Sequence, residues 1–472
     1  MENNTNSTVF DKINYSIKNS VSIKLLSIGF LIAILLIPNS MIKSLISERE
    51  FRQEEAIREI SSSWASPQQI TGPILTIPFE AILVLDDGKE ISTIKYAHFL
   101  PEKLKVVGDI NPKSRKRGIY EVALYETQLQ LEGTFSQPDF SKLIKEDDII
   151  LWDMATISIG IPDMRGIQNK IEIQINDKPY LMESGIPKKF ALQLAHANEN
   201  QYSTSRRAEY QSGVSANIDW SEELKSASFS TQLSLHGTQS LKFNPIGKST
   251  IAKLNSPWPH PSFEGQFLPD NHEVTESGFS AEWSIFDLNR NYPQQWVGSE
   301  HRIADSEFGV KLFQPVDNYQ QNTRSAKYAV LILFLTFITF FFIEILNKKR
   351  IHPIHYILVG LTLTIFYTLL LSISEHLNFS AAYWISSLVI IAMISLYSMS
   401  ILKSKKLAGI LFMFFSIIYT FVFVVLKLED YALLFGSVGL LIVLGICMYL
   451  SRNIDWYNIK AKGGLNHAAT EA

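Results

Sequence analysis

Catalytic residues are the first feature to test in this chain of 472 residues. Ser400-Ile401-Leu402-Lys403 has the S-x-x-K spacing of a penicillin-binding or β-lactamase site, but it has no downstream K-T-G partner and lies at the end of an apolar run. The sequence contains no G-x-S-x-G, Walker A or H-E-x-x-H motif. We therefore predict a protein that is not an enzyme, with no catalytic residues, no cofactor and no metal.

A second set of polar residues interrupts the apolar C-terminal part of the chain. Glu375 and His376 form one short break, and Lys427, Glu429 and Asp430 belong to another. Charges at such breaks are compatible with a solvated rim of loop-capping ion pairs. They also fit a junction at which the preceding domain docks onto the helices, where His376 would add pH sensitivity.

These residues are positioned by long apolar runs. A helix needs roughly 20 apolar residues to cross a bilayer core of ~30 Å. The sequence predicts one such span at 21–42 and five more within 328–450, at 328–346, 354–374, 382–402, 407–426 and 431–450. The first could instead be a cleaved signal peptide, but its exit, Pro38-Asn39-Ser40-Met41, lacks an A-x-A-like site. We expect an uncleaved anchor.

The distribution of positive charge predicts how the spans are oriented. Twelve Lys and Arg residues fall in the short segments on one side, whereas Lys427 alone falls in the short loops on the other. By the positive-inside rule, both termini are cytoplasmic and residues 43–327 are periplasmic. Residues 1–20 form a disordered cytoplasmic tail, and residues 451–472 form a second cytoplasmic tail.

The exported segment changes character along its length. Residues 43–66 predict a juxtamembrane helix that starts with a capping box of Ser47 and Glu50. From there to residue 327 the apolar residues alternate with period two, which is typical of β-strands. The length suits one β-rich domain or two subdomains with a boundary near 195–218. The fold class is thus an α+β membrane protein: six transmembrane helices, one N-terminal and five C-terminal, with a large mainly-β periplasmic domain after the first.

Charge and cysteine content indicate which kinds of partner the protein can bind. Residues 43–327 carry a net charge of −8, which argues against nucleic acid. The single cysteine, Cys447, allows no disulfide within the chain, as is common in bacterial periplasmic domains. We expect the lipid bilayer as one partner, and envelope proteins or envelope polymers as others. The sequence does not predict the oligomeric state.

Many ordered motifs, from about residue 52 to residue 457, resemble the CreD family. They are Arg58-Glu59-Ile60 with Trp64, Gln68 and Gly72-Pro73; Arg115-Lys116-Arg117-Gly118-Ile119-Tyr120-Glu121-Val122; Asp163-Met164-Arg165-Gly166-Ile167; Phe243-Asn244-Pro245-Ile246-Gly247; Ser256-Pro257-Trp258-Pro259 with Pro261-Ser262-Phe263; Gly278-Phe279-Ser280-Ala281-Glu282-Trp283; Ser374-Glu375-His376; Leu428-Glu429-Asp430-Tyr431-Ala432-Leu433-Leu434; and Ile454-Asp455-Trp456-Tyr457.

The resemblance implies an inner-membrane protein of Gram-negative bacteria that maintains cell-envelope integrity. The family is associated with a two-component regulon, with colicin tolerance and with responses to β-lactam stress. It has no established catalytic activity, so it carries no catalytic residues over to this chain. The alternative function is a transporter or lipid-handling protein gated by the β-domain, although the span interiors offer hydroxyls and tyrosines rather than mid-span charges.

Overall fold

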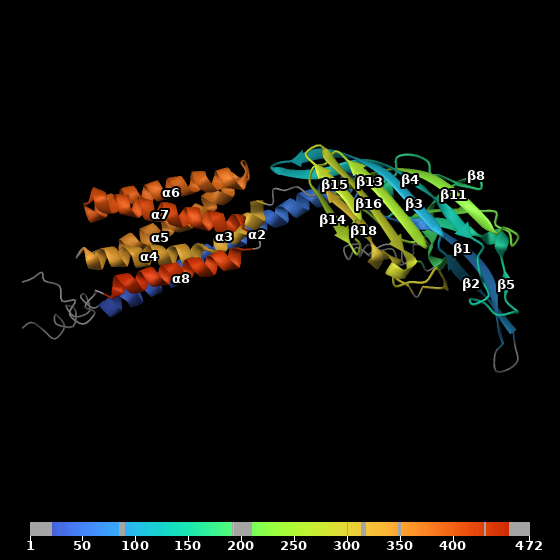
Figure 1. Cartoon of the computed structure of the whole chain (residues 1–472), viewed down its shortest axis with the longest axis horizontal. Helices are drawn as coiled ribbons and strands as arrows, with labels where there is room; N and C mark the ends of the chain where they lie inside the picture. The colour runs from blue at the N-terminus through green and yellow to red at the C-terminus, as the bar shows by residue number, and fades with distance from the viewer. Residues whose placement is uncertain are drawn as a thin grey trace, which may run out of the picture. The chain divides into compact units, whose positions relative to one another are not determined.

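The computed structural model describes residues 21–84, 90–190, 192, 210–299, 301–312, 318–347, 351–428 and 431–452. The chain divides into two compact units (Figure 1). One, the helical unit, comprises Met1–Arg52 and Val316–Ala472, and the other, the β unit, comprises Gln53–Pro315. Each unit is described by itself.

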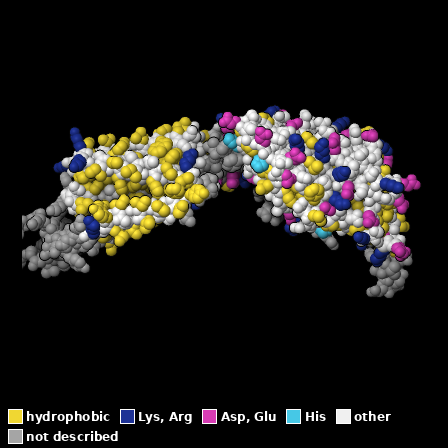
Figure 2. All heavy atoms as spheres, viewed as in Figure 1, with side chains coloured by type: hydrophobic (Ala, Val, Ile, Leu, Met, Phe, Trp, Pro, Cys, Tyr) yellow, Lys and Arg dark blue, Asp and Glu magenta, His cyan; other side chains and the backbone are white. Residues whose placement is uncertain are grey.

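The helical unit contains the membrane-spanning elements. Its helices are the first part of α2 (Val21–Ser63), α3 (Asn318–Lys327), α4 (Ala329–Leu346), α5 (Pro353–Ser374), α6 (Phe379–Leu402), α7 (Lys405–Lys427) and α8 (Ala432–Ser451). In the described residues six segments are long and apolar enough to cross a membrane, with α3 and α4 counted as one. Hydrophobic side chains cover the visible face of this unit (Figure 2). The predicted arrangement of one N-terminal and five C-terminal spans is confirmed.

Local side chains define where the spans begin. The Asn378 Oδ1 accepts a hydrogen bond from the Ala381 amide at 2.8 Å at the start of α6, and the Ser404 Oγ accepts one from the Leu407 amide at the start of α7. These caps satisfy amide groups that the first turn of a helix leaves without a partner. Lys403 adopts a left-handed backbone conformation, with φ of 47°, and ends α6. Connections this short make successive spans antiparallel.

Helix α2 runs without a break from Val21 to Ser63 and contributes to both units. Ser47 therefore lies inside the helix and does not act as the N-cap that the local motif predicts. Glu48 and Arg52, one turn apart on this helix, form an ion pair at 2.7 Å. Pro38 also lies within the helix. The helix continues past residue 42, where the first span was predicted to end.

The β unit is built from two large sheets. The ten-stranded sheet has the order β14-β18-β12-β1-β6-β10-β9, with β2 and β5 also paired to β1, and β17 paired to β2. The eight-stranded sheet has the order β15-β16-β13-β3-β4-β11-β7-β8. The strands are β1 (Gln68–Val84), β2 (Glu90–Phe99), β3 (Lys103–Arg117), β4 (Tyr120–Ser136), β5 (Ile149–Ile150), β6 (Thr156–Gly160), β7 (Glu172–Ile175), β8 (Lys178–Leu181), β9 (Glu183–Pro187), β10 (Tyr210–Asn217), β11 (Ser226–Thr238), β12 (Ser240–Phe243), β13 (Ser249–Ser256), β14 (Pro261–Gly265), β15 (Asn271–Thr275), β16 (Gly278–Phe286), β17 (Gln295–Val297) and β18 (Phe308–Leu312).

Side-chain alternation explains why these strands pair into sheets with one buried face. Buried and exposed residues alternate along β3, β11 and β13, so each strand turns one row of side chains to the core. One cluster of buried hydrophobic residues, from Ile70 to Leu312, draws on both sheets, and Trp283 within it is fully buried. Residues on both sides of the expected 195–218 boundary contribute to this cluster, and the two-subdomain alternative stays a prediction.

One ionisable residue lies deep in this core. His98, on β2, is fully buried, and its Nδ1 lies 3.0 Å from the Thr76 hydroxyl on β1. Burial disfavours the charged imidazole and lowers the pKa of His98 to about 4, although a hydrogen bond with the Phe190 backbone partly opposes this. His98 is therefore neutral in the folded protein at physiological pH.

We expect acidification to destabilise the β unit through His98. The folded pKa lies below the unfolded value of about 6.5, so the unfolded chain binds a proton first. The free energy of unfolding should hold its full value above about pH 6.5 and fall by roughly 1.4 kcal/mol per pH unit between about pH 6.5 and 4 from this residue. Hydrogen exchange of the β1 and β2 amides in the full chain measures it. The slope should diminish in His98→Gln but not in His260→Gln, which alters an exposed histidine; equal slopes in both variants would disprove the assignment.

Candidate functional site

The structure places one residue of the predicted junction in a polar network. Glu375 caps the C-terminal end of α5, and its carboxylate is only 12% exposed. Its Oε1 lies 3.7 Å from the Arg49 Nε on α2 and accepts a hydrogen bond from the Tyr319 hydroxyl on α3 at 3.3 Å. Glu375 thus links three helices of the helical unit.

Helix α3 supplies further polar contacts to the same end of α5. The Asn322 amide donates to the Ser374 hydroxyl at 2.8 Å, and the Asn318 amide donates to the Ser374 carbonyl. Residue types alone did not predict that α3 binds the end of α5. The segment is polar and precedes a span, so its sequence is typical of the outer domain. Its buried side chains, which include Tyr319 and Asn322, place it among the helices.

The other predicted junction residues are not part of this network as far as the structure describes them. His376 is exposed. Lys427 is also exposed, and its ammonium lies 6.0 Å from the centre of the Phe423 ring. Glu429 and Asp430 lie outside the described residues. Docking of the β unit at these five residues therefore stays a prediction.

A buried ion pair joins the N-terminal helix to the C-terminal helices. Glu344 on α4 is 5% exposed, and its Oε1 lies 2.5 Å from the Lys24 ammonium on α2. The carboxylate also accepts hydrogen bonds from the Tyr356 hydroxyl and the Ile351 amide, both at 3.3 Å. An acidic residue inside an apolar run was the sequence signal for this contact, but its partner is 320 residues away.

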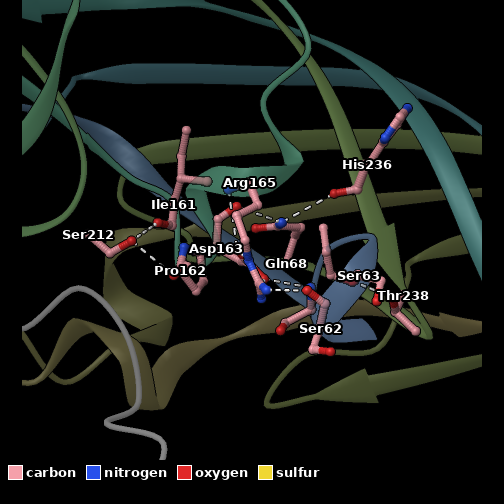
Figure 3. A network of polar contacts seen from close by, with 12 residues as sticks. Ser62, Ser63, Gln68, Ile161, Pro162, Asp163, Arg165, Ser212, His236 and Thr238 are labelled. Carbon is pink, nitrogen blue, oxygen red and sulfur yellow. Dashed lines mark hydrogen bonds and ion pairs between the residues drawn. The ribbon is translucent and has the colours of Figure 1, made fainter. Parts of the chain in front are cut away.

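A polar network of the β unit surrounds Asp163 (Figure 3). The Arg165 guanidinium binds both Asp163 oxygens, with Nε–Oδ1 and Nη2–Oδ2 distances of 2.8 and 2.6 Å. Asp163 Oδ2 also accepts a hydrogen bond from the Ser66 amide at 2.8 Å, while Arg165 donates to the Ser62 carbonyl. We name this set of four residues the α2 clasp, because it binds the backbone where α2 ends.

The clasp satisfies groups that the end of a helix leaves unpaired. The Ser62 carbonyl belongs to the last turn of α2, where carbonyl oxygens lack intrahelical donors and a cation is favourable. Burial opposes ionisation of Asp163, but hydrogen bonds from Arg165 and Ser66 outweigh it and lower the pKa of the carboxyl to about 2. The clasp is thus charged at all physiological pH values.

Neighbouring contacts reinforce the clasp. The Gln68 amide donates to the carbonyls of Asp163 and His236 at 3.1 and 3.2 Å. The Trp64 ring stacks on the His236 ring, with centroids 4.0 Å apart. Gly166 has to be glycine, since a Cβ there would lie 2.4 Å from the His236 carbonyl oxygen. Motifs far apart in sequence therefore meet at one place.

The comparisons with known proteins agree with these motifs. The family described as inner membrane protein CreD matches residues 20–457. The chain belongs to the CreD family. It is 32% identical over 446 residues to the inner membrane protein CreD of Escherichia coli strain K12, covering 93% of this chain and 95% of that protein. The resemblance inferred from the sequence is confirmed, and the match includes both units of this CreD-family chain.

The motif residues around the clasp make their contacts within the protein. In the described part of the chain, no group of three or more His, Cys, Asp and Glu side chains could hold a metal ion. The motif residues Gln68, Asp163 and Arg165 instead bind one another and the backbone, and the motif residue Trp64 stacks on His236. Their part in holding the end of α2 was missed from sequence because it depends on contacts between residues about 100 positions apart.

Removing the clasp should loosen the last turns of α2. Asp163→Ala leaves the Ser66 amide and the Arg165 guanidinium without their acceptor, at an expected cost of about 2 kcal/mol. Amide hydrogen exchange in residues 53–66 of the full chain should rise more than tenfold at neutral pH. The difference from wild type should shrink only as the pH falls from about 4 to 2, because in that range the opened chain binds a proton at Asp163 while the folded carboxyl is still ionised. Asp219→Ala, which removes an exposed partner of Lys178, is the control and should change nothing there.

The Lys24–Glu344 pair predicts an asymmetry between its two partners. Lys24→Met strands a carboxylate that is 5% exposed and should cost about 3 kcal/mol. Glu344→Gln should cost under about 1 kcal/mol, because the amide still accepts a hydrogen bond and Lys24, 39% exposed, reaches solvent. Thermal unfolding in lipid nanodiscs compares the two, and the double variant should recover most of the Lys24→Met loss. Equal costs for the two single variants would contradict the assignment.

Proposed function

We propose that this protein is a non-enzymatic inner-membrane factor for cell-envelope integrity and envelope-stress response, which binds or scaffolds an envelope component through its β unit. The observation that carries the proposal is the family match, which extends over residues 20–457. The family's association with β-lactam stress and colicin tolerance supplies the biological setting. The six apolar helices hold the protein in the lipid bilayer.

The proposed orientation follows from charge. With twelve Lys and Arg residues on one side of the spans, both termini are cytoplasmic and residues 43–327 are periplasmic. Charged side chains of both signs are spread over the visible face of the β unit (Figure 2), as suits an aqueous compartment. This side of the membrane exposes the β unit to envelope polymers and proteins.

The use of buried ionisable groups supports a role without catalysis. In the β unit, Asp163 binds the end of α2, and His98 lies against Thr76. Arg290 is also buried, and its guanidinium donates to the carbonyls of Tyr292 and Ile246. Each of these groups makes contacts within the fold.

A transporter or lipid-handling protein is the second candidate. One observation favours it: hydroxyls of Tyr367 on α5, Ser386, Ser395 and Ser398 on α6, and Tyr419 on α7 are buried and find no hydrogen-bond partner among the described residues. Water or a polar substrate between these helices would satisfy them. The hydroxyls are uncharged, which fits a polar substrate better than ion coupling.

In-cell crosslinking tests the binding role. A photoreactive amino acid at Gln232, an exposed position on β11, should capture an envelope protein or polymer when cells are treated with a β-lactam, and mass spectrometry identifies the product. The same group at Ile417, an exposed apolar position on α7, should capture lipid only. Failure to capture any envelope component from Gln232 and from other exposed positions of the β unit would reject the binding role.

Thiol labelling of the same cells tests the proposed orientation. In a Cys447→Ser background, Gln232→Cys should react with a membrane-impermeant maleimide in cells whose inner membrane is intact. Ala469→Cys, near the C-terminus, should react only after that membrane is disrupted. The reverse pattern would place the β unit in the cytoplasm.

A further inference from the structure

A row of polar side chains crosses the eight-stranded sheet of the β unit. It consists of Gln128 on β4, Asp109 on β3, Asn255 on β13, Ser280 on β16 and Glu273 on β15. Each is paired in register with the next across the ladder. All five lie on the solvent side, since the alternate residues of β3 and β13 are buried. Five neighbouring strands thus present polar groups in one line.

The row opens into a groove where two strands part. Strand β13 pairs with β3 only as far as Asn255 opposite Asp109, whereas β3 continues beside β4 to Arg117. The turn between β15 and β16 closes the other side. Gly278, with φ of +139°, permits this close approach, because a Cβ there would lie 2.1 Å from the Ser256 carbonyl oxygen. The resulting groove has a volume of about 700 Å³, within the roughly 300–1,000 Å³ of ordinary small-molecule sites.

The chemistry of the lining selects among ligands. Asp109 and Glu273 supply carboxylates, Asn111, Gln128 and Asn255 supply carboxamides, and four Ser and Thr residues supply hydroxyls. None of the described residues that line the groove is Lys, Arg or His. A phosphorylated or carboxylated ligand would meet like charge without a compensating cation. In the described part of the chain, no group of three or more His, Cys, Asp and Glu side chains could hold a metal ion, so the two carboxylates do not favour a lone cation.

We propose that this groove binds a neutral saccharide chain. A sugar hydroxyl both donates and accepts, so adjacent hydroxyls can serve the carboxylates as donors and the carboxamides as either partner. The Asn255 amide already donates to Asp109 Oδ1 at 3.2 Å, which directs the Asn255 carbonyl oxygen to another donor. Pro257, exposed beside the row, offers an apolar surface for the C–H face of a sugar ring.

This inference rests on the proposed function only for the compartment in which the saccharide is bound. The groove itself does not depend on the β unit being periplasmic. The envelope compartment contains glycan polymers, so a groove of this kind names the chemical class of the component that the β unit binds. The row uses residues of β13 and β16 that the family motifs flank or include, namely Asn255 next to Ser256-Pro257 and Ser280 within Gly278–Trp283. The clasp and the helical unit play no part in it.

Calorimetric titration of the full chain in lipid nanodiscs, free of alkyl-glycoside detergent, tests the proposal. The probes are chitotetraose and maltohexaose as neutral saccharides, and tetralysine as a cationic peptide. We expect at least one saccharide to bind with a Kd below about 1 mM. Gln128→Ala and Asn111→Ala should each weaken it about tenfold or more, which corresponds to ~1.4 kcal/mol. Gln174→Ala, at an exposed position of β7 in the same sheet but outside the groove, should leave it unchanged.

A charge-neutral variant separates the two ligand classes. Asp109→Asn combined with Glu273→Gln keeps acceptor oxygens but removes both charges, so saccharide binding should stay within about tenfold of wild type. Binding of tetralysine alone, or of neither saccharide by a chain whose far-UV dichroism is native, overturns the proposal. Loss of binding in Gln174→Ala equal to that in Gln128→Ala overturns it as well.

The outcomes also distinguish this proposal from the proposed function. Saccharide binding by a chain whose Gln232→Cys thiol is shielded in intact cells would reject the periplasmic role and leave the groove standing. A periplasmic β unit that captures an envelope protein but binds neither saccharide would reject the groove alone.

Discussion

The bidentate ion pair between Asp163 and Arg165 is the interaction that fixes the end of α2 within the β unit. Helix α2 is continuous from Val21 to Ser63, and a helix ends with carbonyl groups that need donors. Arg165 supplies one of those donors, and Asp163 accepts the amide of Ser66 just beyond the helix. Without these contacts, the helix end would expose unsatisfied backbone to a largely buried surface. Strand β1 begins at Gln68, two residues after Ser66.

In the helical unit, too, carboxylates are paired with basic side chains. Glu344 lies within a run of apolar residues, and Lys24, Tyr356 and Ile351 together satisfy its carboxylate. Glu375, near the other end of α5, links to Arg49 and Tyr319. In both cases α2 provides the basic partner, because a carboxylate removed from water requires a compensating cation and hydrogen bonds. The N-terminal helix is therefore held to the C-terminal helices at two levels of the helical unit by matched charges.

Buried polarity and solvent-facing polarity have different uses in the β unit. His98, Asp163 and Arg290 are buried and bound to neighbouring protein atoms, so they contribute to a fixed fold. Along the groove, in contrast, Asp109, Gln128 and Glu273 are exposed and face water. A ligand must displace only water from such groups, which suits reversible binding of a hydroxylated polymer. The separation of these two populations is the physical basis for our proposal that the β unit binds a ligand.

Sequence alone determined the features that depend on local pattern. Six spans follow from apolar runs of about 20 residues, since bilayer thickness sets that length whatever the neighbours are. The β-rich domain follows from period-two alternation, and the family follows from motifs such as Asp163-Met164-Arg165-Gly166. Only the tertiary structure decided the rest. Ser47 looks like a cap, yet lies inside one long helix, and α3 reads as outer domain, yet packs with the spans. Lys24 and Glu344 are 320 positions apart, Ser66 and Asp163 are 97 apart, and Asn255 and Asp109 in the polar row are 146 apart. Such contacts arise from packing, which no local pattern encodes.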